Sequence, residues 1–248
     1  MLRPRQTFEQ QMQELEQKLL QFGFFVEAML DKAVRALASQ DLDLAKEVVA
    51  ADDTADEMDL QIEETAVRLL ALQQPVSRDL RTIGTAMKVI ADVERIGDYS
   101  VDIARIAIDL AETEYFKPLV DIPEMAELVR QMLRMALEAL VKRDLHRVTQ
   151  VIELDDGVDR MWRALRRELE DIMQQQPAVV PQAVSLILVA RYLERIADHT
   201  ENIVERVAYI ETGQLAALAP SHRPDYAPPQ SPGGEPPAAP ASPVPPAP

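Results

Sequence analysis

The chain of 248 residues contains no cysteine, only seven glycines and 4% aromatic residues. Without cysteine it has no disulfide framework, no cysteine-type zinc site and no thiol nucleophile. Few glycines and aromatics, beside long runs of Ala, Leu, Glu, Arg and Val, are typical of an all-α protein. Twelve of the eighteen prolines lie at or after Pro220, so the rest of the chain holds few helix breakers.

The charge of the chain limits its partners. Its formal net charge is −16 at pH 7, and an acidic surface repels phosphate backbones, so we expect no nucleic-acid partner. No apolar run approaches the roughly 18 residues of a membrane-spanning helix. The N-terminal residues also lack the apolar segment of a signal peptide. These absences predict a cytoplasmic protein without a membrane span.

Hydrophobic periodicity predicts six helices, three on each side of a break at Pro118 and Pro123. The helices expected in the first half cover residues 7 to 39, 41 to 73 and 77 to 114, with Thr7, Asp41 and Ser77 as N-caps. Those expected in the second half cover residues 124 to 142, a segment capped by Asp144, and a segment after Pro181 that ends at Gly213.

The predicted fold is therefore all-α, with two tandem, pseudo-symmetric three-helix bundles at residues 7–115 and 122–213. Residues 214–248 are rich in Pro and Ala and have no periodicity, so a disordered tail is expected there. Such a tail is either a solvated extension or a docking motif for a partner.

The two halves align as an internal repeat. Asp52-Asp53-x-x-Asp56 matches Asp155-Asp156-x-x-Asp159 at an offset of 103 residues. After the proline loop the offset becomes 100, and Glu94-Arg-Ile-Gly-Asp98 matches Glu194-Arg-Ile-Ala-Asp198. A duplicated three-helix unit is the simplest interpretation.

The repeated acids fall on or beside the apolar stripes of their helices when the chain is placed on a helical wheel. Asp52 and Asp56 lie near the middle of their expected stripe, and Glu94 lies inside the next one. A carboxylate in an apolar seam is costly unless something neutralises it. Arg95 and Arg195 point about 100° away from the neighbouring Glu, which makes them poor partners. A bound cation between the second and third helices of each half is the economical answer.

The expected metal-binding residues are Asp52, Asp56, Glu94 and Asp98 in the first half, and Asp155, Asp159, Glu194 and Asp198 in the second. Additional candidates are Asp53, Asp102, Asp156 and Asn202. All-oxygen ligand sets suit Mg, Mn or Fe. The alternative for any such pair is a solvated acidic face. That interpretation applies to Glu27 and Asp31, whose repeat counterparts are Arg130 and Arg134. His199 is interpreted as an edge residue rather than a ligand.

The third helix of each half carries a second apolar strip opposite the first. In the first half it comprises Ile96, Tyr99, Ile103, Ile106 and Leu110, and in the second Tyr192, Ile196, Ile203 and Val207. A helix that is apolar on two sides is buried on two sides. The strip serves either the packing of one bundle on the other or a dimer surface.

From residue 7 to about 213 the chain resembles the PhoU family, accessory regulators of bacterial phosphate-specific transport. The most specific stretches are Gln74-Pro-Val-Ser-Arg-Asp-Leu-Arg81, followed by Glu94 to Asp98, and Ala190-Arg-Tyr-Leu-Glu-Arg-Ile-Ala-Asp-His199. The resemblance implies multinuclear metal clusters, iron or zinc among them, held by the eight acids named above. Mg or Mn is also compatible with those ligands.

The resemblance further implies a negative regulator of phosphate uptake and of the phosphate-starvation response. Such a protein contacts a sensor histidine kinase and the ATPase of the phosphate ABC transporter, and a homodimer is expected. Through these partners a cytoplasmic protein would reach the inner membrane. The chain departs from the family pattern at Ala197, where glycine is expected, and at Tyr99, where histidine is common.

Three other functions compete with the adaptor. A carboxylate-bridged di-iron oxidase would use Glu-x-x-His motifs, and no histidine of the chain follows a Glu at that spacing. A metal-dependent phosphohydrolase would need a nucleophile or a Gly-rich phosphate loop, and neither is evident. A purely structural bundle with empty acidic faces is the third. The leading hypothesis is a non-enzymatic, metal-binding regulatory adaptor.

Overall fold

The computed structural model describes residues 4–214, which confirm the expected all-α fold and contain no strand. Their helices are α1 (Pro4–Ser39), α2 (Leu42–Ala50), α3 (Asp52–Gln73), α4 (Ser77–Leu110), α5 (Asp121–Lys142), α6 (Leu145–Gln175), the 3₁₀ helix η1 (Pro177–Val179) and α7 (Val180–Thr212). The tail predicted to be disordered lies outside the described residues, apart from Gln214. No helix among residues 4–214 combines the length and apolar character that a membrane span requires.

Three helix ends agree with the sequence. The Asp41 side chain accepts a hydrogen bond from the Leu44 amide at 3.0 Å, which caps α2. Asp144 caps α6 in the same way. Helix α7 ends at Thr212, and Gly213 caps it with a φ of 72°, in the left-handed region that glycine adopts without strain.

Other expected helix ends were wrong. Because α1 begins at Pro4, Thr7 lies inside the helix, and Ser77 is the first residue of α4 with no side-chain cap before it. The helix expected from residue 41 to 73 is divided at Ala51, whose amide donates to the carbonyls of both Glu47 and Val48. This bifurcated bond bends the chain without any proline or glycine to signal it.

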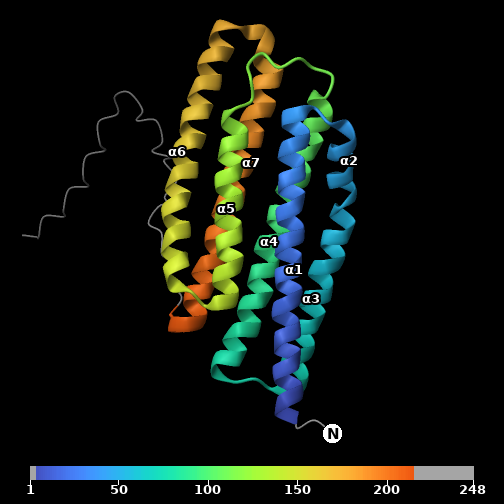
Figure 1. The fold of residues 1–248 in the computed structure, drawn as a ribbon, viewed down its shortest axis with the longest axis vertical. Coiled ribbons are helices and arrows are strands. Elements are labelled where there is room, and N and C mark those ends of the chain that lie inside the picture. The colour runs from blue at the N-terminus through green and yellow to red at the C-terminus, as the bar shows by residue number, and fades with distance from the viewer. Residues whose placement is uncertain (1–3, 215–248) are drawn as a thin grey trace, which may run out of the picture. The chain divides into compact units, whose positions relative to one another are not determined.

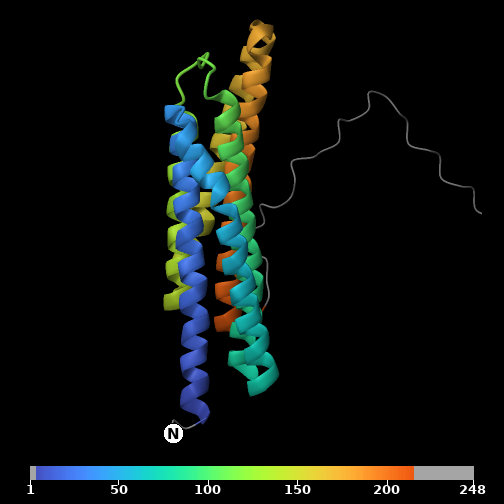
Figure 2. The ribbon, with the colours of Figure 1, turned by 90° about the vertical axis from the view of Figure 1, so that its right-hand side faces the viewer.

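The helices form two bundles that pack side by side (Figure 1). Helices α1 to α4 pack on one another, as do α5 to α7, and the two groups meet through α1 with α5 and α4 with α7. Turned by 90°, α1 and α5 lie in one layer and α4 and α7 in another (Figure 2). The described residues belong to a single unit, so the boundary at residues 115–122 stays a prediction.

The second apolar strip of α4 and α7 packs inside this unit. Ile96 and Ile103 of α4, and Ile196 and Ile203 of α7, are each 0% exposed. Tyr99 and Tyr192 stack across the contact with ring centroids 5.5 Å apart. The strip therefore serves packing between the bundles.

Glu27 and Asp31 are not the ordinary surface pair that the sequence predicted. Glu27 is 7% exposed and forms an ion pair with Arg134, while Asp31 contacts Arg130 at 2.9 Å. The partners are the repeat counterparts of the two acids. Because α1 and α5 run antiparallel, each acid pairs most closely with the repeat counterpart of the other acid.

Arg134→Ala tests this contact. The change leaves the buried Glu27 carboxylate with a longer contact to Arg130, at 3.7 Å, and we expect a loss of about 1–3 kcal/mol in the free energy of unfolding in urea. The control is Arg35→Ala, which removes an exposed pair with Asp31 at 3.5 Å and should cost less than about 0.5 kcal/mol. Equal losses in the two variants would contradict the role given to the buried pair.

Candidate cation sites

The acids of the first bundle come together where α3 packs on α4. Buried residues of α3 recur in a seven-residue pattern at Ala55, Ile62, Ala66 and Leu69. Asp59 and Asp52 belong to the same pattern, seven and fourteen residues before Ala66, and both are half-buried. They face α4, which presents Glu94 and Asp98 from the flank of its buried face.

Asp56 is exposed, so its expected place in the middle of the apolar stripe is wrong. A straight wheel drifts by roughly 20° for every seven residues against a strict heptad pattern. The expected stripe also joined Ala45 of α2 to Ala66 of α3 as if residues 41 to 73 were one helix, whereas the chain is divided at Ala51. The heptad position belongs to Asp59, which the predicted ligand set left out.

Partial burial and mutual repulsion raise the pKa of two carboxylates of the first cluster. Burial and the neighbouring charges of Asp56 and Asp98 raise the pKa of Asp52. The pKa of Glu94 is raised by burial, by Asp98 and by Asp59, against a lowering by Arg95. Carboxylates from two helices therefore resist losing their protons together.

Arginines take part in the cluster, contrary to the expectation from the wheel. Arg95 Nη1 donates to Asp98 at 2.9 Å and Arg95 Nε lies 3.6 Å from Glu94. Arg195 Nη1 donates to Asp198 at 3.0 Å in the second bundle. The wheel describes where a side chain leaves the helix, whereas a long guanidinium folds along the surface to a residue three positions on.

The second cluster is more deeply buried than the first. Asp155 of α6 is 6% exposed and Glu194 of α7 is 8% exposed. Burial, with the charges of Asp198 and Asp159 and against those of Arg191 and Arg195, raises the pKa of Glu194 to about 7. Glu194 Oε2 is buried without a hydrogen-bond partner.

Cations of the chain already compensate part of the second cluster. Arg191 donates to Glu194 Oε1, and its guanidinium lies 5.8 Å from the ring centroid of Trp162. Arg163 donates to Asp159. In the first bundle Ala91 and Asp59 stand at the positions of Arg191 and Trp162. At these two positions the first cluster therefore has an alanine in place of an arginine and an acid in place of a tryptophan.

The additional candidates divide into two groups. Asp53 and Asp156 are exposed, and the structure places neither in the seam between helices. Asn202 donates to Asp92 of α4 at 3.2 Å, and Asp102 is held by Arg105 at 3.1 Å. Asn202 thus joins the two bundles, while Asp102 is linked to the first cluster through Arg105, which lies 4.0 Å from Asp52.

His199 lies at the contact between the bundles, as its interpretation as an edge residue expected. Its Nδ1 is 2.9 Å from Asp92 Oδ1, and its ring lies 5.9 Å from that of Tyr99. Sequence reasoning missed Asp92. The available signal was its repeat counterpart Tyr192, which belongs to the second apolar strip and so places residue 92 at the same contact.

A family model described as the PhoU domain matches residues 19–107 and again residues 122–207. The chain belongs to the PhoU family.

Curated PhoU relatives cover most of the chain. A phosphate-specific transport system accessory protein PhoU homolog from Clostridium acetobutylicum is 36% identical over 211 residues, which are 85% of this chain and 96% of the relative. A homolog of the same name from Aquifex aeolicus is 37% identical over 205 residues, 83% of this chain and 93% of the relative.

Solved PhoU structures share the fold. The crystal structure of PhoU from Pseudomonas aeruginosa matches with a TM-score of 0.81 at 36% identity, covering 84% of this chain and 100% of that one. PhoU from Streptococcus pneumoniae matches with a TM-score of 0.80 at 32% identity, covering 85% of this chain and 100% of that one.

The donor atoms of both clusters have the chemistry of a cation site, although their present positions do not form one. All are carboxylate oxygens, acids of two helices repel one another, and Glu194 Oε2 is buried without a hydrogen-bond partner. Within residues 4–214, no three His, Asp or Glu side chains lie close enough to hold an ion as they stand. Binding would therefore require carboxylates to turn away from the arginines that they now contact.

Glu194→Gln tests the electrostatics of the second cluster in protein treated with chelator. The folded-state pKa of Glu194, about 7, lies above its ordinary value of 4.5. The stability that this shift contributes is fully present below pH 4.5 and is lost as the pH rises through about 7. The free energy of unfolding in urea should therefore fall less steeply between pH 4.5 and about 7 for the variant than for the wild type. Glu153→Gln, on the exposed face of α6, should keep the wild-type slope, and an unchanged slope in Glu194→Gln would refute the shift.

Proposed function

We propose that the chain is a metal-binding adaptor that restrains phosphate uptake and the phosphate-starvation response. The observation that carries this proposal is the pairing of carboxylates across α3 and α4, repeated across α6 and α7. The relatives that this chain matches over most of their length are named as accessory proteins of phosphate-specific transport. These names support the regulatory part of the proposal, and the acidic clusters support the metal.

In the first bundle Asp52, Glu94 and Asp98 would hold the metal, with Asp56 and Asp59 within reach. In the second, Asp155, Asp159, Glu194 and Asp198 would hold it. A divalent or trivalent cation supplies the positive charge that lets neighbouring carboxylates ionise together. Iron, zinc, Mg and Mn are the candidates. Filling either cluster would clamp two helices of one bundle.

The two clusters should differ in affinity for a cation. The second competes with Arg191, which Trp162 holds in place beside Glu194. The first has Ala91 at that position and an additional acid, Asp59. An incoming cation therefore meets less positive charge in the first cluster, and we expect that cluster to fill at lower metal concentration.

The partners proposed for the adaptor are the ATPase of the phosphate ABC transporter and the sensor histidine kinase. A homodimer and a non-enzymatic role belong to the same proposal. The competing di-iron oxidase needs histidines among the metal ligands. His199 instead lies against Asp92 and Tyr99 at the contact between the bundles, which disfavours that enzyme.

Metal titration tests the cation sites. Chelator-treated wild-type protein titrated with Mn²⁺, Fe²⁺ or Zn²⁺ should show two binding events of unequal affinity. Glu94→Ala combined with Asp98→Ala should abolish the tighter one. The matched control, Asp43→Ala combined with Glu64→Ala, removes two exposed acids of the same bundle and should leave both events in place. Loss of binding in the control, or none in the test variant, would count against the proposed ligands.

Gene expression tests the regulatory role separately. A strain that lacks this chain should express a phosphate-starvation reporter even in excess phosphate, and the wild-type gene should restore repression. The variant with Glu94→Ala and Asp98→Ala should restore it poorly if metal supports the active shape. Normal repression in the deletion strain would overturn the adaptor without affecting the metal sites.

A further inference from the structure

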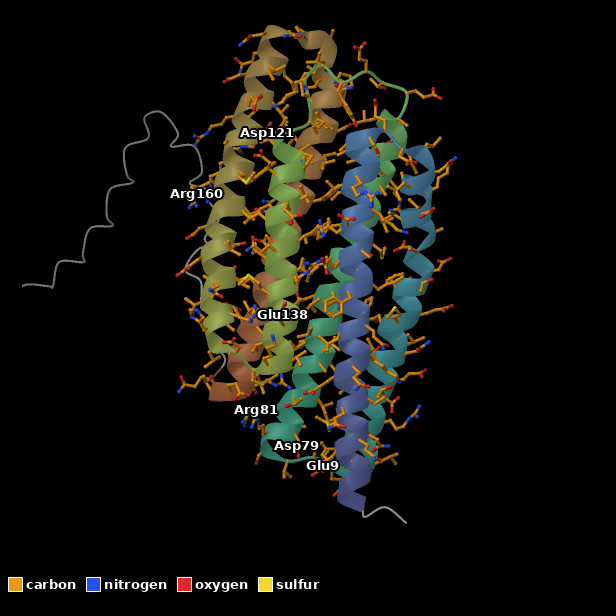
Figure 3. The ribbon with its side chains drawn as sticks, in the orientation of Figure 1. Glu9, Asp79, Arg81, Asp121, Glu138 and Arg160 are labelled. Carbon is orange, nitrogen blue, oxygen red and sulfur yellow. The ribbon has the colours of Figure 1, made fainter. Side chains whose placement is uncertain are left out.

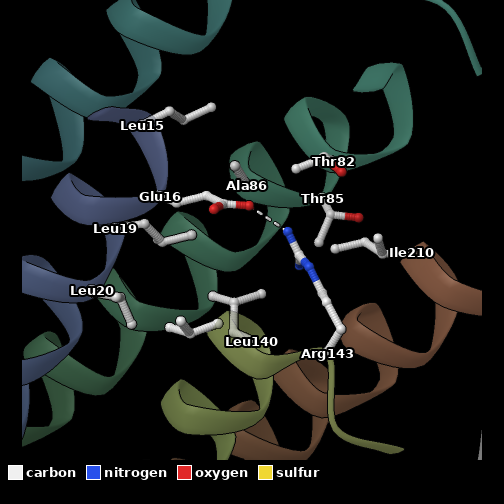
Figure 4. A pocket seen from close by; sticks show the side chains of 11 residues that line it. Leu15, Glu16, Leu19, Leu20, Thr82, Thr85, Ala86, Leu140, Arg143 and Ile210 are labelled. Atoms are coloured by element: carbon white, nitrogen blue, oxygen red, sulfur yellow. Dashed lines mark hydrogen bonds and ion pairs between the residues drawn. The ribbon is translucent and has the colours of Figure 1, made fainter. Parts of the chain in front are cut away.

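A small pocket lies between the two bundles at the end where α5 and α7 stop, which we call the lower end (Figure 4). Its apolar walls are made by Leu15, Leu19, Leu20, Ala86, Leu140, Val141 and Ile210, and its polar lining by Glu16, Thr82, Thr85 and Arg143. A wider depression that includes Phe8 and Met12 adjoins it and shares Glu16, Thr82 and Arg143. Together they form a continuous surface.

Polar groups of this lining lack partners among the described residues. Thr85 is 3% exposed, and its hydroxyl has no hydrogen-bond partner. Arg143 Nη2 donates to Glu16 at 2.5 Å, whereas Arg143 Nη1 is buried and unpartnered. Buried polar groups of folded proteins are nearly always hydrogen-bonded. Two groups of the lining, Arg143 Nη1 and the Thr85 hydroxyl, can therefore donate hydrogen bonds but have no acceptor among the described residues.

At the opposite end of the bundle contact, the equivalent place is covered by the segment that joins α4 to α5. Gln40 Nε2 donates to the carbonyls of Leu110 at 2.7 Å and Thr113 at 2.8 Å. Gln182 accepts from the Phe116 amide at 3.0 Å and donates to the Glu114 carbonyl at 3.1 Å.

Side chains of the same segment complete the cover. Tyr115 donates to the Leu37 carbonyl at 2.7 Å, and burial raises the pKa of Tyr115 to about 12. Tyr115 and Phe116 both pack on the hydrophobic core. The connecting segment thus supplies apolar side chains and backbone groups to one end of the contact between the bundles.

Four residues at the end covered by the α4–α5 segment have repeat counterparts that line the lower pocket. The pairs are Leu37 and Leu140, Gln40 and Arg143, Leu110 and Ile210, and Gln182 and Thr82, at offsets of 103 for the first two and 100 for the others. All four lower members line the pocket. The offset of 100 also carries Glu114 to Phe116 onto residues 214 to 216, which directly follow α7.

The chain leaves α7 beside the pocket. Gly213 turns it with φ 72°, and a Cβ added at Gly213 would lie 3.9 Å from Arg81 Cζ. Figure 3 shows Arg81 near the lower end of α4, one turn before Thr85 in the pocket wall. Residues just after Gly213 therefore start within reach of the lining.

We propose that Leu215-Ala-Ala-Leu218 of this same chain seats in the lower pocket, as the α4–α5 segment covers the other end. Its leucines match the apolar walls, and its backbone carbonyls match the unpartnered Arg143 Nη1 and the Thr85 hydroxyl. Because the segment directly follows α7, closing so short a loop costs little entropy. The inference is independent of metal binding and of phosphate regulation.

Engineered disulfides test the proposal, because the chain has no cysteine of its own. Val141→Cys, at the pocket, is paired with Leu215→Cys in the full-length chain. The control pair is Leu145→Cys with Leu215→Cys, since Leu145 is 44% exposed in the first turn of α6 and does not line the pocket. Under mild oxidation the pocket pair should close on the order of ten times faster than the control pair, because docking raises the local concentration of the second thiol.

Non-reducing electrophoresis and mass analysis of the joined peptides read the result. Equal rates for the two pairs would overturn the proposal. A disulfide-linked dimer as the main product would also overturn it and assign the pocket to a second copy of the chain. Leu20→Cys with Leu218→Cys supplies an independent pair in case the first destabilises the fold, as judged by thermal unfolding of the reduced protein, and it should close intramolecularly as well.

Discussion

The contact between α4 and α7 is the constraint on which the rest of the structure depends. Each of these helices is buried on the side that faces its own bundle and on the side that faces the other. The charged residues of α4, none of which is fully buried, then occupy the remaining flanks. Glu94 and Asp98 lie on such a flank of α4, where α3 brings Asp52 and Asp59 against them. The acidic clusters are thus a consequence of how the central helices are shared.

The repeat gives the two bundles one geometry and different chemistry. Across the central contact, Tyr99 stacks on Tyr192, and the equivalent pair is His199 with Asp92. In α3 an acid, Asp59, stands where α6 has Trp162. A duplicated unit that has diverged in this way keeps its packing while its two clusters acquire unequal charge. The two ends of the contact between the bundles differ in a similar way. Among the described residues, the α4–α5 segment covers one end, and no equivalent segment covers the lower pocket.

Much of the fold was predictable because it depends on local patterns. Asp41 and Asp144 cap helices, Gly213 ends one, and the repeat implied two equivalent bundles. The break at Ala51 was not predictable, because it arises from a bifurcated backbone hydrogen bond that requires no particular residue type. Pairing across the repeat, as between Glu27 and Arg134, depends on the antiparallel contact of α1 with α5, which the sequence does not display.

The candidate site was predictable in part. The wheel and the repeat placed Asp52 on the second helix of the half beside Asp98 on the third, and the charge of Asp98 does raise the pKa of Asp52. Asp56 was misplaced because the wheel treated residues 41 to 73 as one straight helix, whereas the chain is divided at Ala51 and the buried residues of α3 follow a seven-residue pattern. The roles of Arg95 and Arg195 were misjudged because the wheel gives only the direction of the Cβ atom. Their long side chains fold along the helix surface to Asp98 and Asp198. Whether these acids bind metal stays a prediction, since the cost of their burial has more than one remedy, including retained protons.

Anomalous X-ray diffraction tests that central claim most directly. Crystals of the full-length chain grown with Mn²⁺, Fe²⁺ or Zn²⁺ and measured at the absorption edge should show a peak between α3 and α4 beside Glu94. A second peak, of equal or lower occupancy, should appear between α6 and α7 beside Glu194. Metal at other positions, or neither peak at millimolar metal, would contradict the account and leave retained protons and arginines as the means by which the chain tolerates its buried acids.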